Sequence, residues 1–572
     1  MAMRRHVEWI VRPDESDATA LDGAADGSDG SDGISPLVSR LLAQRGVVGE
    51  DEVKRFLYPR LADLSDPFQL PQMSEAVERV LRAIDEQETV VLYGDYDVDG
   101  VTSITLMVKI LEAYGLNPGT LLPSRMDEGY GLSIKGLERC FRETTPSLVI
   151  AVDCGTSSLR EAEWLKEKGV DLVILDHHEG SPAGRPECVA LVNPKLGDDF
   201  HYLCSAGVVF KLGHALLKIR PVPDFDLRDV LDIVAVGTVA DIVPLVDENR
   251  ILVRKGLQQL GKTGNHGLRA LKGVASVSIP VTSTDVGFRL GPRLNAAGRI
   301  DSAQASLDLL LADSDGVAER HANSLDDRNR ERKSLEERIQ REANDQLKEI
   351  FDHESDSAIV IGSESWHPGV IGIVAARICR LHHRPTFVIA FDDEGIGKGS
   401  GRSVKGISLV DAIRRCDDLL LQGGGHDMAA GISIEREQLH PFRERMGELI
   451  GEAASNGELI PKIHIDAETK LRDLDLDLLE SYELLQPFGS ANPEPVFLCR
   501  GVSLSEEPRV LKEKHLKLSL MQDGALRSAM WFNAPINELP SLPWDIAFTI
   551  DRNTFRGRTS LSIMIQAVRS VE

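Results

Sequence analysis

From residue 89 onward, short apolar runs alternate with longer amphipathic stretches. Runs at 89–94, 120–123, 147–153 and 170–176 are apolar at consecutive positions, which is typical of strands covered on both faces. Stretches at 101–115, 132–141 and 158–169 carry apolar residues at helical spacing. The alternation predicts an α/β fold with a doubly wound, mainly parallel sheet.

The pattern changes on either side of this region. Residues 36–85 are helical in pattern, 315–350 form a charged helix-favouring run, and a second α/β pattern with strands at 357–363 and 386–391 follows. The last hundred or so residues are strand-like, which favours a small β-barrel. We therefore predict an N-terminal segment (1–70, disordered in its Asp/Gly/Ser-rich part at 13–35), a first α/β domain (71–312), a connector helix (313–350), a second α/β domain (351–456) and a barrel (460–572).

Composition narrows the class of protein. The 572 residues include seven cysteines without a CxxC pair, and neither a secretory leader nor a membrane-spanning apolar run is evident, so we expect a reduced, cytoplasmic protein. The net charge of −25 argues against nonspecific nucleic-acid binding, although residues 500–572 hold ten Lys/Arg against eight Asp/Glu. A salt-adapted surface is another explanation of the acidity.

Acidic residues follow the predicted strands of the first domain. Asp95, Asp97 and Asp99 come after the run at 89–94, Asp153 after the next long run, and Asp176-His177-His178 after the third; Asp241 follows a further apolar stretch. Because the carboxyl ends of parallel strands share one edge, these side chains are expected to gather there. Oxygen ligands with one or two imidazoles suit Mn²⁺ or Mg²⁺ better than zinc and can hold the two ions of a hydrolase.

Each of these residues has a simpler interpretation when taken alone. Asp153 or Asp241 could cap a helix, and the paired histidines could be surface residues. Their joint occurrence at successive strand ends is what favours the metal site. The segment 95–100 also matches half of an EF-hand loop, but Leu106 stands where the bidentate glutamate belongs, and a strand precedes the loop.

Three glycine-containing segments are candidates for phosphate binding. Residues 256–263 match the P-loop expression, yet the residues before and within them favour a helix, so we reject a nucleotide site and an ATP-driven motor. The segments 395–403 and 423–426 are predicted to be Gly-rich loops. They could present Ser400, Arg402 and His426 to phosphates, or they could be tight structural turns; the local sequence favours neither.

The motifs DYDVDG, VDCG, LDHHE and GTVADIVPL, in this order, resemble those of the DHH phosphoesterase superfamily. SRMDEGYGLS, SAGVVFKL, GPRLNAAGRI, SGRSVKGISL, GGGHDMAAG and LLQPFGSANPEP narrow the resemblance to the RecJ family of single-strand-specific exonucleases, from about residue 36 to the end. The resemblance implies a DHH catalytic domain, a connecting helix, a DHH-associated domain and an OB-type barrel. It also implies 5′-to-3′ hydrolysis of single-stranded DNA to 5′-mononucleotides, in repair and recombination, with two Mn²⁺ or Mg²⁺ ions.

The resemblance also implies roles for individual residues. Expected metal ligands are Asp97, Asp99, Asp153, His177 and Asp241, with Asp95 as a further ligand or support and Asp176 and His178 in support; His178 and His426 join the catalytic set. Expected contacts to the substrate are Arg125, Arg299, Ser400, Arg402, Gly424 and Gly425, with Arg293 and Asn295 as weaker candidates.

For the barrel, candidate DNA contacts are His515, Trp531, Phe532, Phe555, Lys512, Lys514, Lys517, Arg556 and Arg558, although Trp531 is better explained as barrel core. Single-stranded DNA is the expected partner, with a single-strand-binding protein and a helicase as collaborators, and the monomer is the default state. Two alternatives remain: a phosphodiesterase for short oligonucleotides or cyclic dinucleotides, and a non-catalytic single-strand-binding scaffold. The extra barrel argues against the first, and an intact ligand set against the second.

Overall fold

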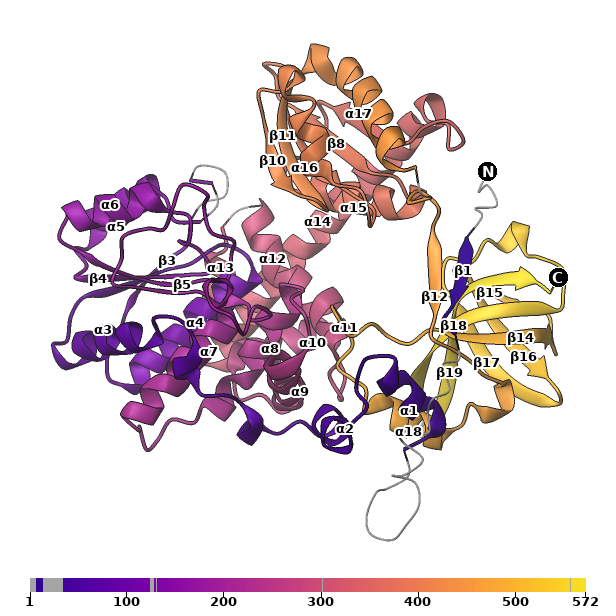
Figure 1. Ribbon diagram of the computed structural model, residues 1–572, viewed down its shortest axis with the longest axis horizontal. Coiled ribbons are helices and arrows are strands. Elements are labelled where there is room, and N and C mark those ends of the chain that lie inside the picture. The colour runs from indigo at the N-terminus through magenta and orange to yellow at the C-terminus, as the bar shows by residue number, and fades with distance from the viewer. Residues whose placement is uncertain are drawn as a thin grey trace, which may run out of the picture.

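The structure is a computed structural model that describes residues 7–13, 34–123, 128–129, 131–300, 302–455, 457–555 and 557–571. Three sheet-containing bodies follow one another along the chain, and the long helix α14 (Asp315–Ile350) joins the first to the second (Figure 1). Among the described helices, none is long and apolar enough to cross a membrane.

The first body is built on a five-stranded sheet in the order β3-β2-β4-β5-β6. Every neighbouring pair is parallel, which confirms the predicted sheet. The strands are β2 (Val90–Tyr93), β3 (Gly119–Leu121), β4 (Leu148–Val152), β5 (Asp171–Leu175) and β6 (Ala190–Val192). The sequence analysis did not identify β6, which has only three residues.

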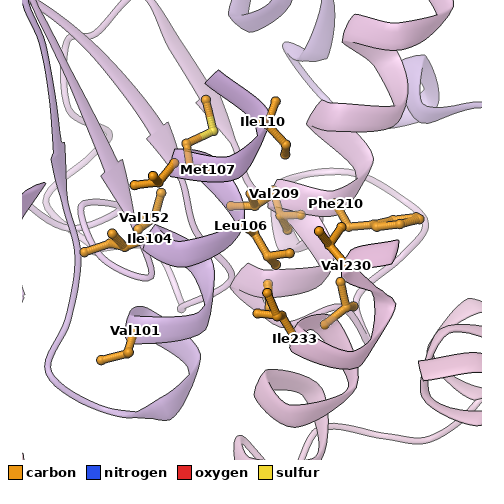
Figure 2. Packing of buried hydrophobic residues seen from close by; sticks show 14 of the residues in the cluster. Val101, Ile104, Leu106, Met107, Ile110, Val152, Val209, Phe210, Val230 and Ile233 are labelled. Carbon is orange, nitrogen blue, oxygen red and sulfur yellow. The ribbon is translucent and has the colours of Figure 1, made fainter. Parts of the chain in front are cut away.

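Helices cover both faces of this sheet. Alternate strand residues such as Val91 and Val149 pack with α5 (Ile134–Glu143) and α6 (Leu159–Glu167). Their neighbours pack on the other face with α3 (Met73–Asp85), α4 (Val98–Ala113) and α7 (Ser205–Ile219). The helix α4 is buried between the sheet and α7–α8, so it is apolar on every side rather than on one stripe (Figure 2). This packing fixes the start of α4, which carries Asp97 and Asp99.

The remaining helices of this body are α8 (Leu231–Ala240), α9 (Asp247–Gly261), α10 (His266–Val274), α11 (Ser283–Asp285), the π-helical turn η6 (Val286–Leu290), α12 (Gly291–Ile300) and α13 (Gln304–Leu310). Gly256 of the rejected P-loop lies inside α9, where a Cβ would stand 2.2 Å from the Leu231 carbonyl oxygen of α8. Its glycine therefore permits close packing of two helices.

The second body has a mixed five-stranded sheet in the order β10-β11-β9-β8-β7. Its elements are β7 (Ile359–Ser363), α15 (Ile371–His382), β8 (Thr386–Phe391), β9 (Ile396–Arg402), α16 (Leu409–Arg414), β10 (Gln422–His426), β11 (Ala429–Glu435) and α17 (Leu439–Ala453). The predicted Gly-rich loops are wrong: residues 396–402 are a central strand and 422–426 an edge strand. Both segments pair with β11. Their glycines, which have no Cβ, let bulky neighbouring side chains pack closely against these strands.

The third body is a barrel closed by pairing of β14 with both β18 and β16. Its strands are β13 (Ala467–Glu468), β14 (Phe497–Leu504), β15 (Arg509–Leu511), β16 (His515–Gln522), β17 (Ala525–Trp531), β18 (Trp544–Phe555) and β19 (Arg558–Ser570), and α18 (Leu476–Glu483) packs against them. The N-terminal helices α1 (Pro36–Ala43) and α2 (Glu50–Leu57) bury leucines in the same core. In addition, β1 (Glu8–Val11) pairs in parallel with β12 (Lys462–Ile465) beside the barrel. Of the segment predicted to be disordered, residues 14–33 lie outside the described residues.

Candidate metal centre

Three acidic residues lie where β2 ends and α4 begins. Asp95 is fully buried, Asp97 caps α4, and Asp99 occupies its first turn. One oxygen of Asp97 accepts hydrogen bonds from the backbone N–H groups of Asp99 (2.9 Å) and Gly100 (3.2 Å). Gly100 is required at this point because a Cβ there would stand 2.4 Å from the Asp95 carbonyl oxygen. The DYDVDG segment is therefore a tight strand-to-helix turn rather than a calcium loop.

The amino terminus of α7 holds two of the carboxylates. Asp99 accepts hydrogen bonds from the backbone N–H groups of Ser205 (2.7 Å) and Ala206 (3.0 Å), and the Ser205 hydroxyl donates to Asp153 (3.0 Å). Helix N-termini stabilise anions through free N–H groups and the helix dipole. Asp153 follows β4 with φ +61°, a left-handed conformation that is uncommon outside glycine and is often found at functional sites.

Asp176, which follows β5, orients the two histidines. Its carboxylate accepts hydrogen bonds from the backbone N–H groups of His177 (2.8 Å) and His178 (3.2 Å) and lies 2.7 Å from Nδ1 of His178. Thr156 N–H donates to its other oxygen (3.0 Å). The His178 ring stays partly exposed and is fixed through Nδ1 by Asp176. This arrangement is usual for an imidazole whose other nitrogen takes part in a functional site.

His177 lies at the centre of the carboxylates. Its Nε2 is 3.5 Å from Oδ2 of Asp241, 3.6 Å from Oδ1 of Asp153 and 3.9 Å from Oδ2 of Asp99. The apolar stretch before Asp241 is helix α8, which Asp241 ends. Packing of α8 against α4 carries it to the same place, because both helices belong to one buried layer.

The electrostatics of the cluster favour the binding of a cation. Burial, followed by the charges of Asp99 and Asp97, raises the pKa of Asp241 to about 8. Burial, followed by the charge of Asp97, raises the pKa of Asp95 to about 7, and burial also raises the pKa of Asp153 well above its ordinary value. Carboxylates gathered out of water repel one another unless a positive charge joins them.

The donor atoms fit a divalent ion. Within the described residues, three overlapping groups bring one ligand atom per residue to within 4.8 Å of one another: Asp95, Asp97 and Asp153; Asp99, His177 and Asp241; and Asp153, His177 and His178. Among the described side chains, His177 Nε2 and Asp241 Oδ2 are buried without a hydrogen-bond partner. Burial lowers the pKa of His177, which keeps its imidazole neutral and able to coordinate metal. The set is rich in oxygen with one or two imidazoles, which suits Mn²⁺ or Mg²⁺.

His178 differs from His177 in charge. Burial opposes protonation, but the hydrogen bond and charge of Asp176 outweigh it and raise the pKa of His178 to about 9. In turn, the hydrogen bonds from His178 and Thr156 overcome burial and hold the pKa of Asp176 below its ordinary range. His178 is therefore a cation at neutral pH beside a cluster of acids.

Helix α12 runs across the metal centre. A Cβ on Gly291 would lie 3.6 Å from Cβ of Ala240, next to Asp241, and a Cβ on Gly298 would lie 3.0 Å from the Tyr96 carbonyl oxygen, next to Asp95 and Asp97. Arg299 follows Gly298, but its side chain lies outside the described structure, as does the whole of Arg125. Arg293 points its Nε at Asp326 of α14 (2.9 Å), and Asn295 is half-buried on the same helix.

The candidates of the second body lie on its glycine-rich strands. Ser400 and Arg402 share one face of β9, where Arg402 donates to the Ser400 hydroxyl (3.1 Å), and both approach Gly372 of α15. His426 ends the exposed edge strand β10, which also contains Gly424 and Gly425. The pKa of Glu179 is lowered by the hydrogen bond from Lys195 and, to a smaller extent, by the charges of Lys195 and His426. His426 therefore lies within electrostatic range of Glu179, which follows His178.

Barrel candidates divide into core and surface. Trp531 is 6% exposed and packs in the barrel core, which agrees with its structural interpretation. Phe532 is 52% exposed and meets the ring of His515 edge-on at 5.1 Å, near exposed Lys514. Lys512, Lys517 and Arg558 are also exposed, whereas Arg556 and the side chain of Phe555 lie outside the described residues.

Sequence reasoning missed the residues that hold the ligands. Ser205, Ala206 and Thr156 bind the carboxylates, and Asn193 donates to the Thr156 hydroxyl (2.9 Å) and the His178 carbonyl (2.9 Å). The SAG triplet that opens α7 was a usable signal for an anion-binding helix start. For Asn193, which follows the short strand β6, the sequence offered none.

Comparison with family models places three matches in chain order. They are the DHH family N-terminal domain (residues 89–238), the DHHA1 domain (355–452) and the RecJ OB domain (465–567). These matches and the solved relative below bear out the predicted fold class.

Curated relatives match over most of the chain. The single-stranded-DNA-specific exonuclease RecJ of Haemophilus influenzae is 34% identical over 94% of this chain and 96% of its own length. The protein of the same name from Bacillus subtilis is 35% identical over 92% of this chain, which spans 66% of that longer protein.

Solved relatives agree. RecJ from Thermus thermophilus in complex with Mn²⁺ has a TM-score of 0.83 at 29% identity, covering 100% of this chain and 80% of that one; its Mg²⁺ complex has a TM-score of 0.77 at 28% identity, covering 99% and 79%. On these grounds the chain belongs to the RecJ family of single-stranded-DNA-specific exonucleases.

Proposed function

We propose that the chain is a single-stranded-DNA-specific exonuclease that removes 5′-mononucleotides, from the 5′ end, by two-metal-ion hydrolysis of phosphodiesters. The observation that carries the proposal is the buried gathering of Asp99, Asp153 and Asp241 around the neutral imidazole of His177. Relatives that match over almost the whole chain are named single-stranded-DNA-specific exonucleases.

Metal ligands in this proposal are Asp95, Asp97, Asp99, Asp153, His177 and Asp241. When bound, two Mn²⁺ or Mg²⁺ ions stabilise charge on the phosphoryl oxygens and supply a hydroxide nucleophile at neutral pH. One of the two solved Thermus structures is a complex with Mn²⁺ and the other a complex with Mg²⁺. The backbone N–H groups of Ser205 and Ala206 orient Asp99 and favour its ionised form, against the burial that raises its pKa.

Histidines supply positive charge beside the phosphate in this scheme. His178, held as an imidazolium by Asp176, can balance charge on the phosphate or give a proton to the leaving oxygen. His426 ends β10 of the second body, within electrostatic range of Glu179, which follows His178. Ser400 and Arg402, with Arg125 and Arg299, are assigned to the 5′ end and the neighbouring phosphates.

The barrel favours a polymer over a short substrate. Exposed Lys512, Lys514 and Lys517 lie on β16 or just before it, and the exposed ring of Phe532 contacts His515 of the same strand. Lysines that track a backbone and a ring that stacks on bases are the usual means of holding single strands without sequence preference. A phosphodiesterase for short oligonucleotides or cyclic dinucleotides would have no use for this surface.

The decisive experiment follows a 5′-labelled and a 3′-labelled single strand in Mn²⁺, with Asp153→Asn as the nearly isosteric inactive variant. We expect immediate release of the 5′ label as a mononucleotide, a shortening ladder from the 3′ label, and no reaction with the variant. Survival of long strands while dinucleotides are cleaved would establish the short-substrate alternative. Binding without cleavage by the native chain would establish the scaffold.

We also propose a cytoplasmic monomer that works with a helicase and a single-strand-binding protein. The support is chemical: an enzyme restricted to single strands needs another activity to separate the duplex and a protein that keeps the strand open. Light scattering would test the monomer, and co-purification with each partner would test the contacts.

A further inference from the structure

The segment 484–493, between α18 and the barrel strand β14, contacts the catalytic body along its length. This segment belongs to the motif LLQPFGSANPEP, for which the proposed chemistry has no use. It begins at the carboxyl end of α18, where backbone carbonyl groups lack partners within the helix.

Arg250 of α9 supplies those partners. The residue is 3% exposed, and its guanidinium donates to the carbonyl oxygens of Leu484 (3.1 Å), Leu485 (3.0 Å) and Gln486 (2.9 Å). It also donates to the Phe56 carbonyl (2.9 Å), with its charged carbon 3.7 Å from the Phe56 ring centre. One arginine of the catalytic body thus binds both the barrel's helix α18 and the N-terminal helix α2.

A second arginine repeats the contact. Arg254, one turn further along α9, donates to the carbonyl oxygens of Leu484 (2.6 Å) and Gln486 (2.9 Å). The negative end of the α18 dipole therefore faces two cations. A guanidinium presents five donors in a fixed plane, whereas a lysine ammonium at either site would satisfy fewer of these carbonyls.

We call the interface between the catalytic body and residues 484–493 the joint. Further hydrogen bonds extend it toward the metal centre. The Leu245 N–H donates to the Ser490 carbonyl (2.9 Å), and the Ser283 hydroxyl donates to the Phe488 carbonyl (2.6 Å). Gly489 is needed beside Leu245, since a Cβ would lie 2.7 Å from its Cδ1. On the barrel side, Asn492 donates to Leu485 and Pro487 carbonyls and accepts from Arg45.

The joint is continuous with a metal ligand. Asp241 ends α8, Leu245 lies in the short connection that follows, and Arg250 lies in the first turn of α9, so the stretch that carries a ligand at its start docks the barrel at its end. Ile242, between them, is 73% exposed and has φ +62°, a strained conformation for a β-branched residue. The barrel and the metal centre are therefore connected through one short stretch of chain, which sets the separation between them.

We infer that Arg250, with Arg254, is a positioning residue that holds the barrel in line with the metal centre, so that the enzyme favours strands long enough to reach both. The inference rests on the proposed function. Two binding sites held at a fixed separation strengthen the binding of a ligand that spans both, and a loosened joint loses this gain without altering either site. A strand of three nucleotides occupies the metal centre alone and does not depend on the joint.

The test compares 5′-phosphorylated strands of three and thirty nucleotides in Mn²⁺, using the full chain. For Arg250→Lys we expect KM for the long strand to rise by about tenfold, with its kcat and the kinetics of the short strand within about twofold of the native chain. Arg254→Gln, which removes fewer contacts from a less buried position, should give a smaller rise of the same kind. It provides a second measurement if Arg250→Lys does not fold.

Arg384→Lys is the matched control. Arg384 is also a buried arginine that donates to backbone carbonyls, those of Asp356 and Leu459 among them, but away from the barrel joint. It should lower the melting temperature without changing the ratio of long-strand to short-strand KM. An equal change for both strands in the Arg250 and Arg254 variants, or no change for either, would overturn the inference. Absence of hydrolysis by the native chain would instead refute the proposed function.

Discussion

Asp241→Asn should make the metal-free protein more stable while it abolishes catalysis. The substitution keeps the shape of the side chain and removes one negative charge from the cluster around His177. Asp241 suits the test because, among the described residues, nothing donates a hydrogen bond to its Oδ2 that an amide would break. Asp99, by contrast, accepts two backbone hydrogen bonds, so its replacement would mix two effects.

The magnitude follows from the spacing of the charges. Ligand atoms of Asp99 and Asp241 lie within 4.8 Å of each other, with neutral His177 between them. Two unit charges at that distance repel by about 3–4 kcal/mol at an effective dielectric of 20. Proton uptake and the nearby charges of His178 and Lys195 relieve part of this, so we expect a gain of about 1–3 kcal/mol, or about 2–4 °C per kcal/mol in a domain of this size.

The gain should depend on pH in a defined direction. The folded pKa of Asp241 is raised to about 8 from its ordinary 3.8, so its ionisation costs stability progressively as pH rises between these values. The native chain should therefore lose stability relative to Asp241→Asn from about pH 4 upward. The difference between their melting temperatures should be small near pH 4 and largest at pH 8 and above.

Thermal unfolding in EDTA and in Mn²⁺ measures both parts. Mn²⁺ at a hundred times its Kd should stabilise the native chain by about 2.7 kcal/mol and the variant by much less. Asp232→Asn is the control on the same helix: Asp232 is buried but accepts hydrogen bonds from Ile233 and Thr263, so it should not gain stability and should keep the Mn²⁺ response. A metal-free variant no more stable than the native chain at pH 8 would refute the electrostatic reasoning.

Three further predictions concern packing. Lys211→Met should cost about 3–5 kcal/mol in denaturant unfolding because it leaves Glu248 buried without its ion-pair partner, and adding Glu248→Gln should recover much of the loss; additive losses would contradict this. Gly256→Ala should destabilise the protein by about 1–3 kcal/mol, and we expect neither the native chain nor this variant to bind ATP. Gly273→Ala, which meets open space on α10, should be neutral or stabilising by up to about 1 kcal/mol. Equal effects of the two substitutions on melting temperature would show that the helix contact is unimportant. Trp531→Ala should cost about 3–5 kcal/mol of stability, while Phe532→Ala should leave stability unchanged and weaken single-strand affinity by about 1–3 kcal/mol in a binding titration, and the reverse order would exchange their roles.

The sequence by itself determined the catalytic sheet and most of the acids at its edge. Strands that are apolar at consecutive positions have to be covered on both faces, and parallel strands bring their carboxyl ends together, so Asp95, Asp153 and Asp176 were expected to meet. The same reasoning identified the helix at 315–350, because a long charged run at helical spacing has few other structures open to it. It also rejected the P-loop, of which residues 256–261 lie within α9.

Only the tertiary structure decided which distant segments complete the site. Asp241 arrives on a helix rather than a strand, and the amino terminus of α7 arrives from a point fifty residues beyond Asp153 to hold two carboxylates; no local pattern specifies such a meeting. The glycine-rich strands β9 and β10 were mistaken for loops because glycine has a low strand propensity that pairing on both sides of β11 overrides.

The joint at Arg250 shows the same limit most clearly. A buried arginine in an amphipathic helix predicts no partner from the sequence. Its partners are backbone carbonyls, which any sequence offers, and they lie 194 to 236 residues away. The docking of α1 and α2 into the barrel core is equally non-local. Local sequence fixes the periodicity and chemistry of each element, but packing and backbone hydrogen bonds between remote segments fix where each element lies.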